Sequence, residues 1–112
     1  MIFEQIAVGP MQNFAYLVGD ERTGLAAVID PAWDVPMILE VAKKRNVRIV
    51  FAIDTHNHPD HTSGNREIAE ATGAKIVAHE YSRTRKDLSV KDGETLRVGS
   101  LKLKFIHTPG HS

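Results

Sequence analysis

The chain has 112 residues, 42% hydrophobic and 25% charged, which is enough apolar material for a buried core and argues against a disordered protein. Its 14 basic and 14 acidic residues cancel, which argues against binding to nucleic acid or anionic lipid. Cysteine is absent, so disulfides are excluded and a transition metal would need imidazole and carboxylate ligands. The first ten residues do not resemble a signal peptide and no apolar run could span a membrane, so a cytoplasmic protein is expected.

The first half of the chain predicts three strands followed by a helix. Residues 2–8, 13–20 and 25–30 place β-branched and aromatic side chains between turn formers, as strands do. Residues 34–46 predict a helix, because apolar side chains recur at helical spacing and basic residues gather at its carboxyl end. Met37, within this helix, is expected to fill the core.

The second half continues as strand, helix, strand and hairpin. Residues 47–54 are almost all apolar, which predicts a strand covered on both faces. A helix is expected at 64–72, closed by Gly73, then a buried strand at 74–80 and a hairpin at 94–105. The basic run at 83–86 is interpreted as a solvated helix end. This order predicts a mixed α/β sheet.

One short segment carries an unusual concentration of metal-binding side chains. It reads T-H-N-H-P-D-H at 55–61 and follows the buried strand, at the edge where open α/β sheets form their sites. His56 and His58 are two residues apart and can converge on one ion. Pro59 stiffens the turn, so that Asp60 and His61 could reach a second position. A solvated loop does not need four such ligands, so metal binding is predicted.

A second segment near the end of the chain supplies further imidazoles. It reads H-T-P-G-H at 107–111, where Pro109 and Gly110 predict a tight turn that presents His111. Three imidazoles from two loops, with a fourth position open to water, are typical of catalytic rather than structural zinc. The same ligands suit iron or manganese, whereas calcium prefers an all-oxygen shell.

The two motifs together resemble the metallo-β-lactamase superfamily. T-H-x-H-x-D-H at 55–61, T-P-G-H at 108–111 and a strand ending in V-I-D-P are similar to its glyoxalase II (hydroxyacylglutathione hydrolase-like) branch and to persulfide dioxygenase. The resemblance implies an αββα sandwich. Residues 1–112 would form one domain of that kind, incomplete at its carboxyl end and corresponding to the first βα half.

The resemblance also implies a ligand set. His56, His58 and His111 would hold metal one, while Asp60 and His61 would hold metal two, with Asp60 also counted as catalytic. One or two zinc ions would activate a hydroxide that attacks a small-molecule thioester or thiol conjugate. The family's metal-bridging aspartate and a further histidine have no counterpart within these 112 residues, which leaves metal two with two ligands.

Several alternatives remain open. Asp30 could orient a ligand histidine or simply shape the turn before Pro31, and His107 is expected to act indirectly rather than as a ligand. His79 is expected to be structural, at the start of a helical turn. The function could instead be that of a mononuclear iron persulfide dioxygenase, or of a metal-binding half-domain without turnover. Nuclease relatives are disfavoured by the zero net charge. An apolar sheet face left open would favour a two-fold homodimer.

Overall fold

The central feature of the computed structural model is a six-stranded mixed sheet in the order β1-β2-β3-β4-β5-β6. The structure describes residues 1–8, 13–31, 35–54, 59–80, 86–91 and 93–105, with the backbone alone at 8, 13 and 59–65. The strands are β1 Ile2–Val8, β2 Asn13–Asp20, β3 Leu25–Ile29, β4 Arg48–Asp54, β5 Lys75–His79 and β6 Leu88–Val90. A separate two-stranded hairpin joins β7 Thr95–Val98 to β8 Leu101–Lys104.

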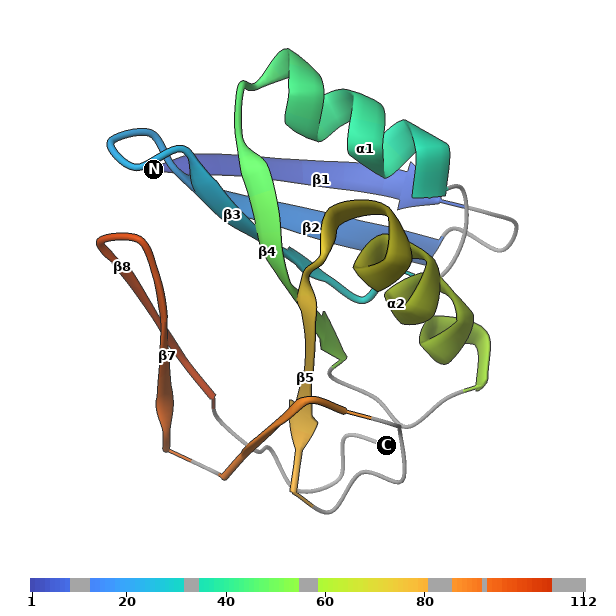
Figure 1. The fold of residues 1–112 in the computed structure, drawn as a ribbon, viewed down its shortest axis with the longest axis vertical. Helices are drawn as coiled ribbons and strands as arrows, with labels where there is room; N and C mark the ends of the chain where they lie inside the picture. The colour runs from blue at the N-terminus through green and yellow to red at the C-terminus, as the bar shows by residue number, and fades with distance from the viewer. Residues whose placement is uncertain (9–12, 32–34, 55–58, 81–85, 92, 106–112) are drawn as a thin grey trace.

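Connection length explains the pairing direction of β1 to β5. The short link between β2 and β3 produces antiparallel pairing, as does the link between β1 and β2. Helix α1, Val35–Lys44, connects β3 to β4, and helix α2, Pro59–Thr72, connects β4 to β5, so these strands pair in parallel. Because β3, β4 and β5 are parallel, their carboxyl ends meet at one edge of the sheet (Figure 1).

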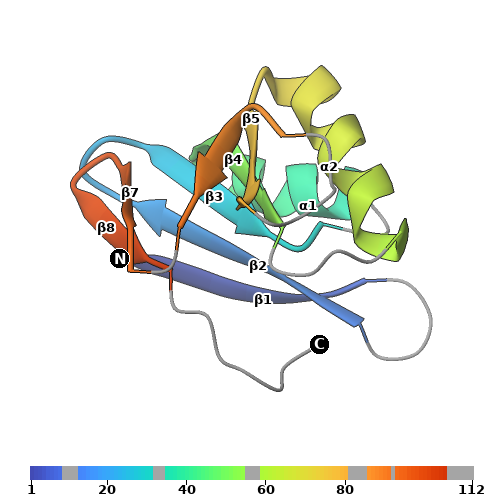
Figure 2. The same cartoon turned by 90° about the horizontal axis from the view of Figure 1, so that it is seen from below.

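Both helices cover the same face of the sheet (Figures 1 and 2). Ile38 of α1 and Ile68 of α2 are fully buried against Leu17 and Ile49 of the strands. Helix α1 ends in a Schellman motif: Asn46 has φ 63°, its N–H donates to the Lys43 carbonyl, and the Val47 N–H donates to the Ala42 carbonyl. This cap turns the chain directly into β4.

The β7–β8 hairpin lies on the opposite face, across from the helices (Figure 2). Val98 is fully buried there in a cluster with Ala27, Ile53, Val77 and Val90, and Leu96, Leu103 and Phe105 pack against it. The expectation of an open apolar face is therefore wrong for β3, β4 and β5. It holds beside β1 and β2, where Phe3 and Phe14 are 49% and 40% exposed and Phe3 stacks on Tyr16.

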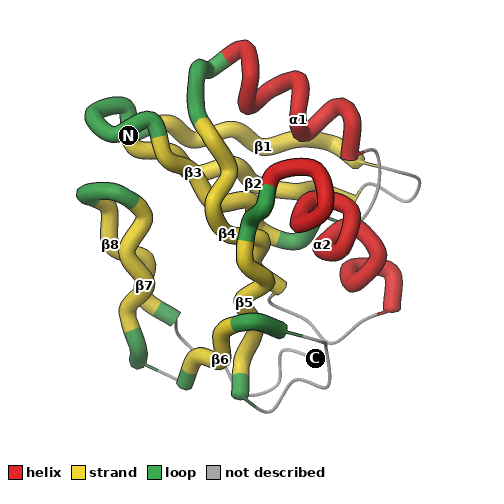
Figure 3. Tube along the Cα trace, in the orientation of Figure 1, coloured by secondary structure: helices red, strands yellow, loops and turns green. Residues whose placement is uncertain are grey.

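Most of the predicted elements are confirmed, with corrections at four places. Helix α2 begins at Pro59 rather than 64, since proline is well suited to the first helical position. His79 ends β5 and is not part of a helical turn. Lys86, from the basic run, lies outside any helix. It precedes the edge strand β6, which the sequence analysis did not predict (Figure 3). Met37 faces solvent and is 39% exposed, so it does not fill the core.

Candidate functional site

The candidate site is the carboxyl edge of the parallel strands. Ile29 of β3 pairs with Ile53 of β4, and Asp54 of β4 pairs with Ala78 of β5, so three strand ends lie side by side. The chain leaves this edge from Asp54 into the motif at 55–61. Sequence reasoning expected the motif to follow a strand that ends at this edge, and β4 does end here, at Asp54.

Asp30 lies at this edge, immediately after β3. Its side chain is buried, at 8% exposure, and its N–H donates to the Ile53 carbonyl at 2.8 Å. Its backbone has φ 55°, a left-handed conformation that aspartate tolerates better than most residues. The following Pro31 is fully buried. Asp30 therefore shapes the turn after β3, as one of the two sequence interpretations proposed, and its backbone lies against the end of β4.

Asp54 is a second buried carboxyl group at the same edge, and the sequence interpretation did not single it out. It is 4% exposed at the last position of β4. A burial cost opposes any carboxylate in a protein interior unless polar partners compensate for it. The signal was present in the sequence, because an acidic residue ends the apolar run I-V-F-A-I-D directly before the first motif histidine.

Asp60 and His61 occupy the first turn of α2 rather than the loop that the sequence suggested. The remaining proposed ligands, His56, His58 and His111, lie outside the described residues, as does His107. No cluster of three metal-binding side chains forms among the side chains that are described.

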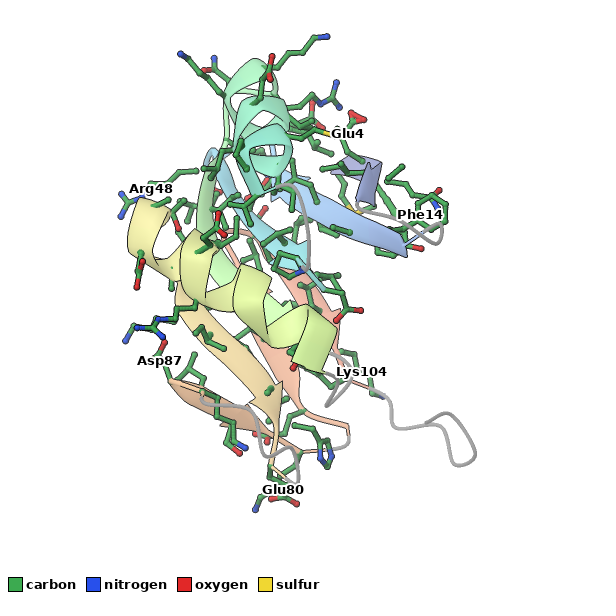
Figure 4. All side chains as sticks on the ribbon, turned by 90° about the vertical axis from the view of Figure 1, so that its right-hand side faces the viewer. Glu4, Phe14, Arg48, Glu80, Asp87 and Lys104 are labelled. Carbon is green, nitrogen blue, oxygen red and sulfur yellow. The ribbon has the colours of Figure 1, made fainter. Side chains whose placement is uncertain are left out.

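Strand β8 of the hairpin ends on the same side of the molecule as the carboxyl edge. The Phe105 N–H donates to the Glu94 carbonyl at 2.9 Å, which extends the hairpin pairing to Phe105, and residues 106–112 follow. Figure 4 shows Lys104, at the end of β8, on the same side as Glu80, which follows β5, and away from Arg48 at the amino end of β4. The two histidine-containing segments thus start from the same end of the molecule.

Two surface depressions among the described residues lie elsewhere. Two shallow hollows, of about 420 and 510 Å³, share Asn46 and Val47 at the amino edge of the sheet. That edge is opposite the strand ends at Asp30 and Asp54, so we do not assign the site to either hollow. Among the helices that the structure describes, none has the length and apolarity needed to cross a membrane.

Comparison with known proteins identifies the family. The sequence profile of the metallo-beta-lactamase superfamily matches residues 8–112. The chain is 39% identical to hydroxyacylglutathione hydrolase of Polaromonas sp., with 100% of the chain and 44% of the relative covered. It is 32% identical to the human mitochondrial persulfide dioxygenase ETHE1, over 89% of the chain and 40% of the relative. The chain therefore spans less than half the length of these curated relatives.

Solved structures agree with this assignment. ETHE1 from Myxococcus xanthus superimposes with a TM-score of 0.86 at 30% identity, covering 93% of this chain and 47% of that protein. A metallo-beta-lactamase from Staphylococcus aureus subsp. aureus COL gives a TM-score of 0.86 at 32% identity, covering 100% of this chain and 36% of that protein. With two helices on one face of a mixed sheet and a matching profile over 8–112, the chain belongs to the metallo-β-lactamase superfamily and has part of its α/β fold.

Proposed function

We propose that this chain carries the metal-binding segments of a thioester hydrolase of the glyoxalase II kind. The observation that carries the proposal is the position of T-H-N-H-P-D-H, which links the carboxyl end of β4 to the amino end of α2. Catalytic groups of open α/β sheets gather at that edge. The similarity to the Polaromonas hydroxyacylglutathione hydrolase supports a small thioester of a thiol carrier as the substrate class.

The proposed ligands form two sets. His56, His58 and His111 hold the first ion, and Asp60 and His61 contribute to a second, weaker one. The available donors fit zinc or iron, because the chain has six histidines and no cysteine.

The surroundings of the edge fit a cationic centre as well. The buried carboxyl groups of Asp30 and Asp54 end neighbouring strands, where they can accept hydrogen bonds from ligand imidazoles. We propose that this is the second role of Asp30, in addition to shaping its turn. His107, which follows β8 in the sequence as His111 does, is proposed to support the site without binding the ion.

The bound ion would polarise the thioester carbonyl and lower the pKa of water. The role proposed for Asp60 is to accept a hydrogen bond from the attacking water and hold it in line with the carbonyl carbon. The water oxygen bonds to that carbon, the carbon–sulfur bond breaks, and a carboxylic acid and a thiol are released. The imidazoles are proposed to remain neutral, with the buried carboxyl groups fixing which ring nitrogen carries the proton.

One alternative is an iron-dependent persulfide dioxygenase. It is favoured by the similarity to the human and Myxococcus proteins named ETHE1, at 32% and 30% identity. The other alternative is metal binding without turnover by the 112 residues alone, since the chain covers only 44% of the Polaromonas relative. Both alternatives retain His56 and His111 as ligands.

Metal content and activity separate these possibilities. Protein made in zinc- or iron-supplemented medium is analysed for bound metal and assayed for hydrolysis of a hydroxyacyl-glutathione thioester and for oxygen consumption with glutathione persulfide. We expect zinc retention and thioester cleavage. Iron retention with oxygen uptake would replace the proposal by the dioxygenase, and metal without either activity would replace it by the binding half-domain.

Two pairs of variants test the ligand assignment. His111→Ala should lose more bound metal than the control His79→Ala, because His79 ends β5 and is not a proposed ligand. Asp60→Asn should reduce the stoichiometry toward one ion while the tighter site stays filled. Equal retention in the two histidine variants, or two equally tight sites in the wild-type chain, would contradict the assignment.

A further inference from the structure

A buried carboxylate ties the tip of the β7–β8 hairpin to the sheet. Asp20 is the last residue of β2 and only 3% exposed. One of its oxygens, Oδ2, accepts hydrogen bonds from the Ser100 N–H and the Ser100 hydroxyl, both at 2.7 Å, and from the Thr23 hydroxyl at 2.9 Å. The other, Oδ1, accepts from the Arg22 N–H at 3.1 Å. Asp20 and Ser100 are 80 positions apart in the sequence.

The tip of the hairpin packs closely against this carboxylate. Gly99 precedes Ser100 in the turn and has φ 61°, in the left-handed region. A Cβ atom at Gly99 would lie 2.5 Å from Asp20 Oδ2 and even closer to Thr23 Oγ1. Glycine is therefore required for this close approach of the turn to Asp20 and Thr23.

The other contacts between the hairpin and the sheet are of a different kind. The hairpin forms its own two-stranded sheet and shares no strand pairing with β1–β6. Val98, Leu96 and Leu103 attach it through an apolar cluster, and apolar contacts are largely non-directional. The charge-assisted hydrogen bonds at Asp20 add direction, because donors must point at the carboxylate oxygens.

The opposite end of the hairpin leads to a proposed metal ligand. Strand β8 runs from the tip toward the carboxyl edge, and His111 follows it in the sequence. At about 3.3 Å per residue, the four residues of β8 span roughly 13 Å. If the hairpin tilted by about 10° around its tip, the far end of β8 would therefore move by about 2 Å. Metal–ligand distances tolerate only about 0.2 Å.

We infer that Asp20 is a positioning residue for the metal centre, acting through Ser100 and the β7–β8 hairpin on the segment that contains His111. The inference rests on the proposed function, since it needs His111 as a ligand. Asp20 itself lies at the amino edge of β3 and β4 and does not touch the reacting atoms.

The test is a double-mutant cycle read by Co²⁺ titration, because the visible spectrum of bound Co²⁺ reports its ligands as well as its affinity. Asp20→Asn should weaken Co²⁺ binding at the tight site by about tenfold, the lower end of the cost of losing a group bonded directly to a ligand, because Asp20 acts through the hairpin. In a His111→Ala background the same change should cost less than about twofold, because there is no longer a ligand to position.

Two further variants control the measurement. Ser100→Ala removes one of the three donors to Oδ2 at an exposed position and should give a smaller loss with the same dependence on His111. It keeps the inference testable if Asp20→Asn does not fold. Glu21→Gln removes a neighbouring negative charge that contacts the amino terminus instead of the hairpin, so Co²⁺ affinity should be unchanged.

The outcomes are distinguishable. If His111→Ala alone leaves affinity and spectrum unchanged, the ligand assignment fails and the inference fails with it. If His111→Ala weakens binding while Asp20→Asn and Ser100→Ala do not, only the inference is overturned. An Asp20→Asn loss of equal size in both backgrounds would also overturn it, by showing a general effect on stability.

Discussion

Replacing Gly99 with alanine tests how firmly the hairpin tip is seated, without removing any polar group. Two costs add at this position. A left-handed backbone costs a non-glycine residue about 1–2 kcal/mol, and Gly99 has φ 61°. The new methyl group would also overlap Thr23 Oγ1 and lie 2.5 Å from Asp20 Oδ2, and overpacking of this kind costs about 1–3 kcal/mol. We therefore expect Gly99→Ala to lower the free energy of unfolding by about 2–5 kcal/mol.

Gly73→Ala is the matched control. Gly73 has φ 78° at the end of α2, but a Cβ there would have no heavy atom within 4 Å. Gly73→Ala should therefore lower the free energy of unfolding only by the cost of the left-handed backbone, about 1–2 kcal/mol. Equilibrium unfolding in urea, followed by circular dichroism, measures both variants. Equal losses would refute the reasoning, because they would show that the tip moves away from Asp20 and Thr23 at no cost.

Three further predictions concern the core, the pH dependence and the uncovered part of the sheet. Ile38→Ala should lower the free energy of unfolding by about 2–5 kcal/mol, because Ile38 is fully buried. Met37 is 39% exposed on the same helix, so Met37→Ala should change that free energy by no more than about 0.5 kcal/mol. Urea unfolding of both variants measures the difference. Hydrogen bonds from the Ser100 N–H and hydroxyl hold the pKa of Asp20 well below its ordinary value of 3.8, so their stabilisation is present above that pH and is lost as the pH falls below it. The stability difference between wild type and Asp20→Asn should therefore shrink on acidification. A difference that stays constant as the pH falls from 6 to 2 would contradict this assignment. Finally, we expect the chain to self-associate, in a concentration-dependent way, through the sheet face beside β1 and β2. Phe14 is 40% exposed on that face, so Phe14→Glu should abolish the self-association measured by light scattering. A wild-type chain that stays monomeric would rule out this interface.

Local pattern determined the order and type of most elements. Alternation at 94–105 predicted the hairpin, and helical spacing predicted α1, because the periods of two and 3.6 residues are properties of the backbone alone. The motif at 55–61 also placed the candidate site at the carboxyl edge, since a strand followed by a helix defines that edge. These inferences needed no knowledge of which residues meet in space.

Tertiary structure decided the rest. Helix α2 extends back to Pro59 although S-G-N within it favours a loop, because most helical stability comes from packing, here from the buried Ile68. The hairpin covers a face that the sequence left open, because periodicity predicts an apolar side but not its partner. Asp20 was predicted only as the last residue of the strand at 13–20, and only the fold brings it to Ser100, 80 positions away. Contacts between distant parts of the chain depend on the whole topology, which no local pattern contains.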